Sequence, residues 1–122
     1  MAHGANQPAP TISTHVLDTE RGAPAAGVPV TLYRLSDDGR PLRLTQALTD
    51  SDGRVRDLLE RPLVIGQYRV EFDLARPADD DPVAGDRFFR RISLDVMVAD
   101  VGRSYHVPLL LAPYSLTTYR GS

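Results

Sequence analysis

The stretch Gln67–Leu74, "QYRVEFDL", decides the fold class of this chain. Its even-numbered positions are all apolar and its odd-numbered positions are all polar. Successive side chains of an extended strand point to opposite faces of a sheet, so this alternation predicts a strand with one buried face. The stretch Arg91–Val98, "RISLDVMV", repeats the pattern with Ile92 and Val98 at its inward-facing ends. Both stretches therefore predict a sheet covered on one side.

The rest of the chain also divides into short segments. Ten prolines and nine glycines punctuate the sequence at short intervals, which is typical of an all-β sandwich or barrel. We expect six more strands, making eight in all. They are Thr11–Leu17, Val28–Leu35, Leu42–Leu48, Val55–Leu58, Ser104–Leu111 and Ser115–Tyr119.

The connections between these strands agree with an all-β fold. Asp37–Arg40, "DDGR", and Ser51–Arg54, "SDGR", both carry Asp-Gly, and each predicts a tight hairpin. Glu20–Gly27 is interpreted as a turn-rich loop. Ala75–Asp86, with two prolines and an acidic cluster, predicts an irregular loop with at most one helical turn.

Length and composition narrow the classes of protein that this chain can form. At 122 residues it predicts one domain over residues 11–122, preceded by a disordered polar segment over residues 1–10 that contains His3. Cysteine is absent, which excludes a disulfide framework, a thiolate nucleophile and a cysteine zinc site. A reducing, cytoplasmic location fits this composition.

Charge and hydropathy argue against two kinds of partner. The formal net charge is −2, and no run of basic residues is interleaved with aromatic ones, so nucleic acid is not expected as a partner. The N-terminus lacks the basic start and apolar core of a secretory signal. The longest apolar stretch, Val107–Pro113, is far too short to cross a bilayer, so no membrane association is expected.

Two histidines are the main candidates for chemistry. His15 and His106 both fall on the strand faces away from the alternating apolar sets. A histidine in such a place is more often a half-exposed polar residue than a catalyst. No metal site is expected, because no histidine pair has ligand spacing. The turn at Asp50 resembles the start of a calcium loop, but Arg61 stands where the closing glutamate belongs.

Other catalytic patterns are weak or absent. The sequence has no Gly-x-Ser-x-Gly elbow, phosphate-binding loop or dinucleotide fingerprint. By spacing alone, Arg54 is best interpreted as a solvated charge beside a turn. Tyr119 and Ser122 are interpreted in the same way as the end of an edge strand. These residues alone support a small β-sandwich and no particular activity.

Three separated segments, taken together, resemble a known protein family, which the spacing of single residues does not indicate. They are "STHVLDTERGAPAAGVPV" (residues 13–30), "TDSDGRVRDLL" (residues 49–59) and "YHVPLLLAPYSLTTYRGS" (residues 105–122). Together they resemble the 5-hydroxyisourate hydrolases, the enzyme branch of the transthyretin-like family, over most of the chain from Thr11 to Ser122. The terminal Tyr-Arg-Gly-Ser is the most specific mark, because the thyroid-hormone-carrying transthyretins lack it.

The resemblance implies a fold, an assembly and a reaction. The fold is a transthyretin-like sandwich of two four-stranded sheets, and the assembly is a homotetramer, a dimer of dimers, with its sites in a channel at the subunit interface. The reaction is hydrolysis of 5-hydroxyisourate to 2-oxo-4-hydroxy-4-carboxy-5-ureidoimidazoline in urate degradation. Neither a metal nor an organic cofactor is implied.

The resemblance also implies roles for individual residues. His15, Arg54, His106 and Ser122 are the implied catalytic residues, and His15, Arg54 and Tyr119 are the implied substrate contacts. A guanidinium can hold a carbonyl-rich heterocycle and stabilise developing negative charge. A neutral imidazole can take a proton from water. Whether His15 or His106 is that base stays open.

Two other functions compete with hydrolysis. One is a non-catalytic carrier of a small ligand, of transthyretin type, which would show saturable binding without turnover. The other is a structural or adhesion sandwich without a small-molecule site. It would be monomeric and indifferent to loss of the last four residues.

Overall fold

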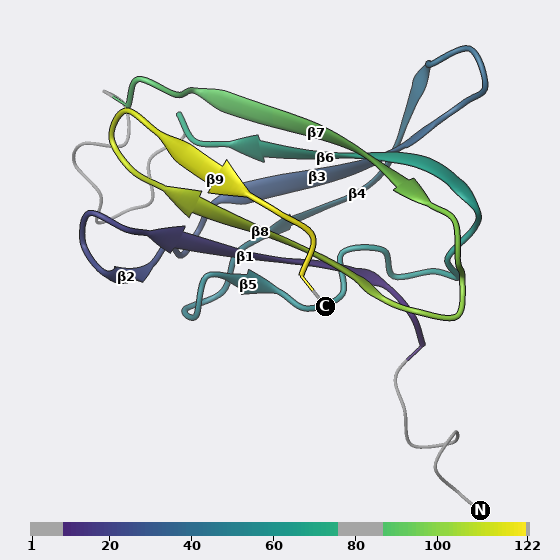
Figure 1. Cartoon of the computed structure of the whole chain (residues 1–122), viewed down its shortest axis with the longest axis horizontal. Helices are drawn as coiled ribbons and strands as arrows, with labels where there is room; N and C mark the ends of the chain where they lie inside the picture. Colours follow the sequence, from purple (N-terminus) through teal and green to yellow (C-terminus); the bar gives the residue numbers. More distant parts are fainter. Residues whose placement is uncertain (1–8, 76–86, 122) are drawn as a thin grey trace, which may run out of the picture.

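The computed structural model describes residues 9–75 and 87–121, and within these ranges the chain forms strands and no helix. Two layers of strands face each other across the core (Figure 1). The strands are β1 (Ile12–Asp18), β2 (Ala23–Pro24), β3 (Pro29–Leu35), β4 (Pro41–Leu48), β5 (Arg54–Val55), β6 (Gly66–Asp73), β7 (Arg91–Val98), β8 (Tyr105–Leu111) and β9 (Leu116–Thr118).

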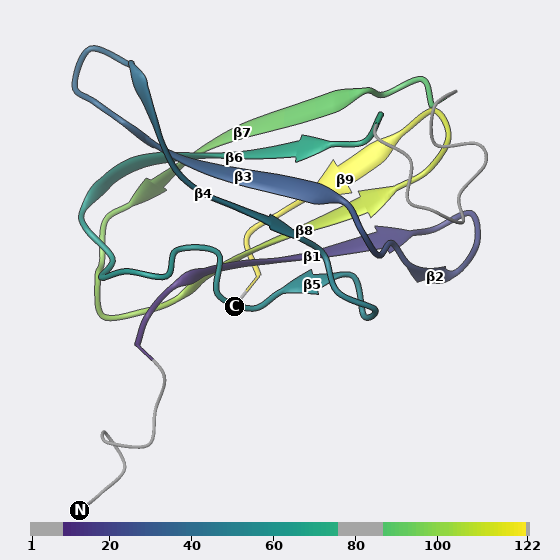
Figure 2. The same ribbon diagram turned by 180° about the vertical axis from the view of Figure 1, so that it is seen from behind.

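The first sheet has the order β2-β1-β8-β9, and β5 also pairs with β1. Within it β1 and β8 run parallel, from the pair Ile12 and Tyr105 to the pair Asp18 and Leu111. The second sheet is antiparallel throughout, with the order β4-β3-β6-β7. Figure 2, seen from behind, shows the same two layers. The predicted sandwich is therefore confirmed, with five strands rather than four in the first sheet.

The inward-facing side chains of the alternating strands fill the space between the sheets. From Tyr68 in β6 to Leu74 just after it, the even-numbered residues are buried, and Phe72 is completely so. In β1 the alternation leaves Ile12 and Val16 fully buried and turns Ser13 and His15 outward. Each large buried side chain contributes about 1.5–3 kcal/mol through the hydrophobic effect. This core fixes which face of each strand is available for a site.

All eight predicted strands have a counterpart whose ends lie within one residue of the prediction, except at β5, and the structure adds the short strand β2. β2 lies inside the predicted Glu20–Gly27 loop, because two residues there pair with the end of β1. β5 is shorter than the predicted strand and begins one residue earlier, at Arg54. Leu58 is buried outside any strand, with its backbone N–H donating to the carbonyl of Ile12.

One of the two Asp-Gly predictions is wrong. Asp37–Arg40 does join a hairpin, β3 with β4. The turn at Ser51–Arg54 is equally tight, but the strands that it joins lie in different sheets, because β4 pairs with β3 whereas β5 pairs with β1. The chain crosses between the layers here.

Several predictions concern positions outside the described residues. They are the disordered state of residues 1–8, the shape of the loop over residues 76–86 and the position of Ser122. Across residues 9–75 and 87–121, no helix is long and apolar enough to span a membrane.

Candidate functional site

The turn at Asp50–Arg54 places the guanidinium of Arg54 beside β1. The Asp50 carboxylate accepts hydrogen bonds from the backbone N–H groups of Asp52 (2.8 Å) and Arg54 (3.0 Å). These bonds, led by the one from Arg54, lower the pKa of Asp50 below its ordinary value. Gly53 has φ 75°, and a Cβ there would lie 2.4 Å from the carbonyl oxygen of Val16. Only glycine fits this turn against β1.

Pairing of β5 with β1 then sets Arg54 directly opposite His15. Both side chains are partly buried on the outer face of the first sheet. Nε2 of His15 lies 2.9 Å from the backbone carbonyl oxygen of Asp52. A carbonyl oxygen only accepts hydrogen bonds, so Nε2 is the donor and carries the proton. The turn that supplies the arginine therefore also orients the imidazole.

His106 reaches the same outer face from β8. The parallel register sets Ser13 opposite His106, and the Ser13 hydroxyl lies 2.9 Å from Nδ1 of the imidazole. Burial lowers the pKa of His106 below its ordinary value, and the charges of Arg54 and His15 lower it further. His106 is therefore neutral at neutral pH, as a proton acceptor or an uncharged hydrogen-bond donor must be.

The C-terminal segment returns across this face after β9 (Figure 1). The backbone N–H of Gly121 donates to the carbonyl oxygen of His106 at 2.7 Å. A Cβ at Gly121 would lie 2.7 Å from Cδ2 of the imidazole. The glycine of the Tyr-Arg-Gly-Ser motif therefore lets the backbone pack directly against the ring.

These elements surround a polar hollow of about 290 Å³. Its lining includes Arg54 and His106, which the sequence predicted, together with four residues that it did not. Those four are Ser13, Thr14, Arg56 and Ser104. Alternation along β1 already placed Ser13 on the outer face, but only the pairing of β1 with β8 shows that it meets His106. Sequence alone gave no signal for that pairing.

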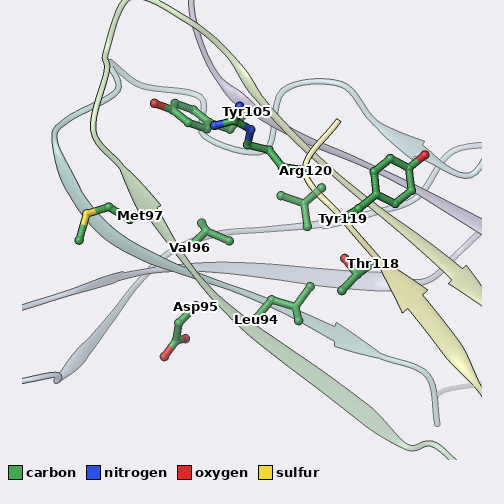
Figure 3. Close-up of a pocket in the computed structure, with 9 residues that line it drawn as sticks. Leu94, Asp95, Val96, Met97, Tyr105, Thr118, Tyr119 and Arg120 are labelled. Atoms are coloured by element: carbon green, nitrogen blue, oxygen red, sulfur yellow. The ribbon is translucent and has the colours of Figure 1, made fainter. Parts of the chain in front are cut away.

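Tyr119 lies elsewhere in this chain. With Arg120 it lines a second, mainly apolar hollow of about 360 Å³ between β7 and the C-terminal segment. Figure 3 shows Leu94 and Val96 of β7 pointing toward this segment and Asp95 pointing away from it. The structure thus brings together His15, Arg54 and His106 of the predicted site residues, but not Tyr119.

Among the described residues, no group of three or more histidine, aspartate or glutamate side chains could hold a metal ion. The polar hollow instead combines the imidazole of His106, the guanidinium groups of Arg54 and Arg56 and two serine hydroxyls, and His15 lies opposite Arg54 in the same sheet. These groups can hold a small, flat, electron-rich molecule and move a proton without a metal. Fold and site together define a small β-sandwich with a polar site suited to acid–base chemistry.

Comparison with known proteins identifies the family. Residues 12–121 match the HIUase/Transthyretin family, and the chain belongs to that family. A relative from Deinococcus radiodurans named 5-hydroxyisourate hydrolase is 45% identical over 116 residues, which cover 93% of this chain and 97% of that protein. The 5-hydroxyisourate hydrolase 2 of Rhizobium meliloti is 44% identical over 119 residues, covering 91% of this chain and 95% of the relative.

Solved structures agree with the family assignment. The 5-hydroxyisourate hydrolase of Klebsiella pneumoniae superposes with a TM-score of 0.75 at 31% identity, covering 93% of this chain and 99% of that one. Sea bream transthyretin in complex with thyroxine superposes with a TM-score of 0.77 at 27% identity, covering 90% and 93%. Fold alone therefore does not separate the enzyme branch from the carrier branch.

Proposed function

We propose that this chain hydrolyses 5-hydroxyisourate to 2-oxo-4-hydroxy-4-carboxy-5-ureidoimidazoline, a step of urate degradation. One observation carries the proposal: two imidazoles and a guanidinium from three separate segments share one outer face of the first sheet. The named hydrolases at 45% and 44% identity support the choice of substrate.

In the proposed reaction, water opens the six-membered ring at the amide carbonyl next to the hydroxylated carbon. Arg54 holds the carbonyl edge and stabilises the negative charge that develops on its oxygen. A neutral imidazole takes a proton from the attacking water, because water alone is a poor nucleophile at neutral pH. Ser122 and Tyr119 complete the proposed set, as a hydroxyl contact and a substrate contact respectively.

We further propose that the working form is a homotetramer, a dimer of dimers, with the sites at the subunit interface. The second hollow supports this, because it lies on exposed edges of both sheets and is lined mainly by apolar groups. Met97 and Tyr119 beside it are 57% and 55% exposed. A partner that covered these edges would bury both side chains. Light scattering on a sizing column tests the assembly.

The test of activity generates 5-hydroxyisourate in situ from urate and urate oxidase and follows its transient ultraviolet absorbance. The full chain is expected to accelerate the decay beyond the spontaneous rate. Arg54→Ala, His106→Ala and a chain ending at Thr118 are expected to lose most of this acceleration. If the full chain leaves the spontaneous rate unchanged, or if the two substitutions leave its activity intact, the proposed function is wrong.

A carrier function is the second candidate, and the apolar hollow is the observation that favours it. The similarity to a transthyretin that was crystallised with thyroxine also favours a carrier function. Saturable binding of an apolar ligand without any turnover would support the carrier. The polar hollow argues against it, because an apolar ligand gains nothing from an imidazole, two guanidinium groups and two serine hydroxyls.

A further inference from the structure

Ser13 holds the imidazole of His106 from the neighbouring strand. Its hydroxyl lies 2.9 Å from Nδ1, in a partly buried position fixed by the β1–β8 register. Within residues 9–75 and 87–121, Nδ1 of His106 is the one hydrogen-bond partner of this hydroxyl. On the Cδ2 side of the ring, the backbone of Gly121 lies so close that a Cβ there would be 2.7 Å from Cδ2. The ring is thus fixed in place, with Nδ1 committed to Ser13.

The direction of this hydrogen bond decides which nitrogen carries the proton. In a neutral imidazole one nitrogen donates and the other accepts. A serine hydroxyl that donates to Nδ1 leaves the proton on Nε2. His106 is then an uncharged donor through Nε2, and it has no lone pair left with which to act as a base.

His15 is held in the complementary way. Its Nε2 donates to the carbonyl oxygen of Asp52, so whenever the ring carries a single proton its lone pair lies on Nδ1. The two imidazoles of the site therefore differ in what they can do. His15 has a nitrogen that can accept a proton, whereas His106 has an N–H that can donate a hydrogen bond.

We propose that Ser13 is a positioning residue that donates a hydrogen bond to Nδ1 of His106 and so gives the two histidines different catalytic roles. This assignment rests on the proposed hydrolysis. Nδ1 of His15 takes a proton from the attacking water, whose oxygen forms a bond to the amide carbon. The carbonyl oxygen becomes an oxyanion that Arg54 and the Nε2–H of His106 stabilise together. The tetrahedral intermediate then collapses, the ring C–N bond breaks, and His15 returns the same proton to the leaving nitrogen.

The proton balance favours this division. A neutral His106 that gave away its Nε2 proton would become an imidazolate, whereas a hydrogen bond to the oxyanion requires no such transfer. The lowered pKa of His106, caused first by burial and then by Arg54 and His15, keeps the ring uncharged.

The experiment reads the tautomer directly in the free protein. Long-range ¹H–¹⁵N correlation spectra of the ¹⁵N-histidine-labelled full chain are recorded at a pH at which both imidazoles are neutral, and assigned with His15→Gln and His106→Gln. We expect both rings to carry the proton on Nε2 in the wild type. In Ser13→Ala, His106 is expected to become a mixture of tautomers while His15 stays unchanged. Ser13→Thr, which keeps a hydroxyl on a strand-compatible side chain, is expected to restore the Nε2–H form.

Kinetics provide the second measurement. Ser13→Ala is expected to lower kcat roughly tenfold, about the value of one hydrogen bond, with little change in KM. A wild-type His106 with its proton on Nδ1, or an unchanged tautomer in Ser13→Ala, would overturn the role of Ser13. These spectra need no substrate, so that failure is distinguishable from an inactive wild type, which would instead refute the proposed hydrolysis.

Discussion

Replacement of Gly121 by alanine tests whether the C-terminal segment shapes the site. The added Cβ would lie 2.7 Å from Cδ2 and 3.1 Å from Cβ of His106. Carbon atoms in contact are ordinarily about 3.5–4.0 Å apart, so the ring or the segment must move by roughly 1 Å. A displacement of that size in a catalytic group costs about 10²-fold in rate. We therefore expect kcat/KM for 5-hydroxyisourate to fall by that factor in Gly121→Ala.

Stability should change much less than activity. The substitution can break one backbone hydrogen bond, from the N–H of Gly121 to the carbonyl of His106, which contributes about 1 kcal/mol to the free energy of unfolding. In a domain of this size such a loss lowers the melting temperature by roughly 4 °C. A large loss of rate with a small loss of Tm would separate a local effect on the site from general unfolding.

Gly102→Ala is the matched control for this prediction. Gly102 is exposed, and a Cβ there would meet only the flexible Asp100 carboxylate, at 3.1 Å. Its decay traces, recorded with urate and urate oxidase, should match those of the wild type. If Gly121→Ala also matches the wild type, the contact between this segment and His106 does not shape the site, and the reasoning fails.

Three further predictions follow from the site and the core. Arg54→Gln should lower kcat/KM by about 10²–10³-fold, as loss of an oxyanion-stabilising group does, and should raise the pKa of His106 in an NMR titration because a repelling charge is removed. Folding lowers the pKa of His106 from 6.5, so the unfolded chain binds more protons than the folded chain as the pH drops below that value. The free energy of unfolding, measured with urea, should therefore fall as the pH drops, and it should fall less in His106→Gln. Phe72→Ala should destabilise the fold by about 3–5 kcal/mol, whereas Phe88→Ala, at an exposed ring, should cost less than about 0.5 kcal/mol.

The fold was predictable from sequence where side chains alternate over a whole strand. Gln67–Leu74 shows the pattern over eight residues, and the structure buries the predicted face. β2 has only two residues, too few to carry a period, so its pairing with β1 could not be predicted. The two Asp-Gly turns show another limit. The same local signal forms a hairpin at Asp38-Gly39 and a crossing between sheets at Asp52-Gly53, because the strand that β5 joins is far away in sequence.

The candidate site was predictable in its residue types and faces, but not in its contacts. Alternation alone placed His15 and His106 on outward faces, and the structure confirms both positions. The contact between Ser13 and His106 joins residues 93 positions apart, through the parallel β1–β8 pair. No local pattern specifies which strands pair, so the hydrogen bond that fixes the imidazole could only be seen in three dimensions.

The register of β1 joins the stability of the core to the chemistry of the site. One face of this strand buries Ile12 and Val16, while the other presents Ser13 to β8 and His15 to β5. A slip of one residue would exchange the two faces, placing the imidazole and hydroxyl in an apolar core. That arrangement would cost several kcal/mol in unpaired polar groups, so core packing itself enforces the alignment of the site. The geometry of the proposed hydrolysis is therefore held by buried residues that never meet the substrate.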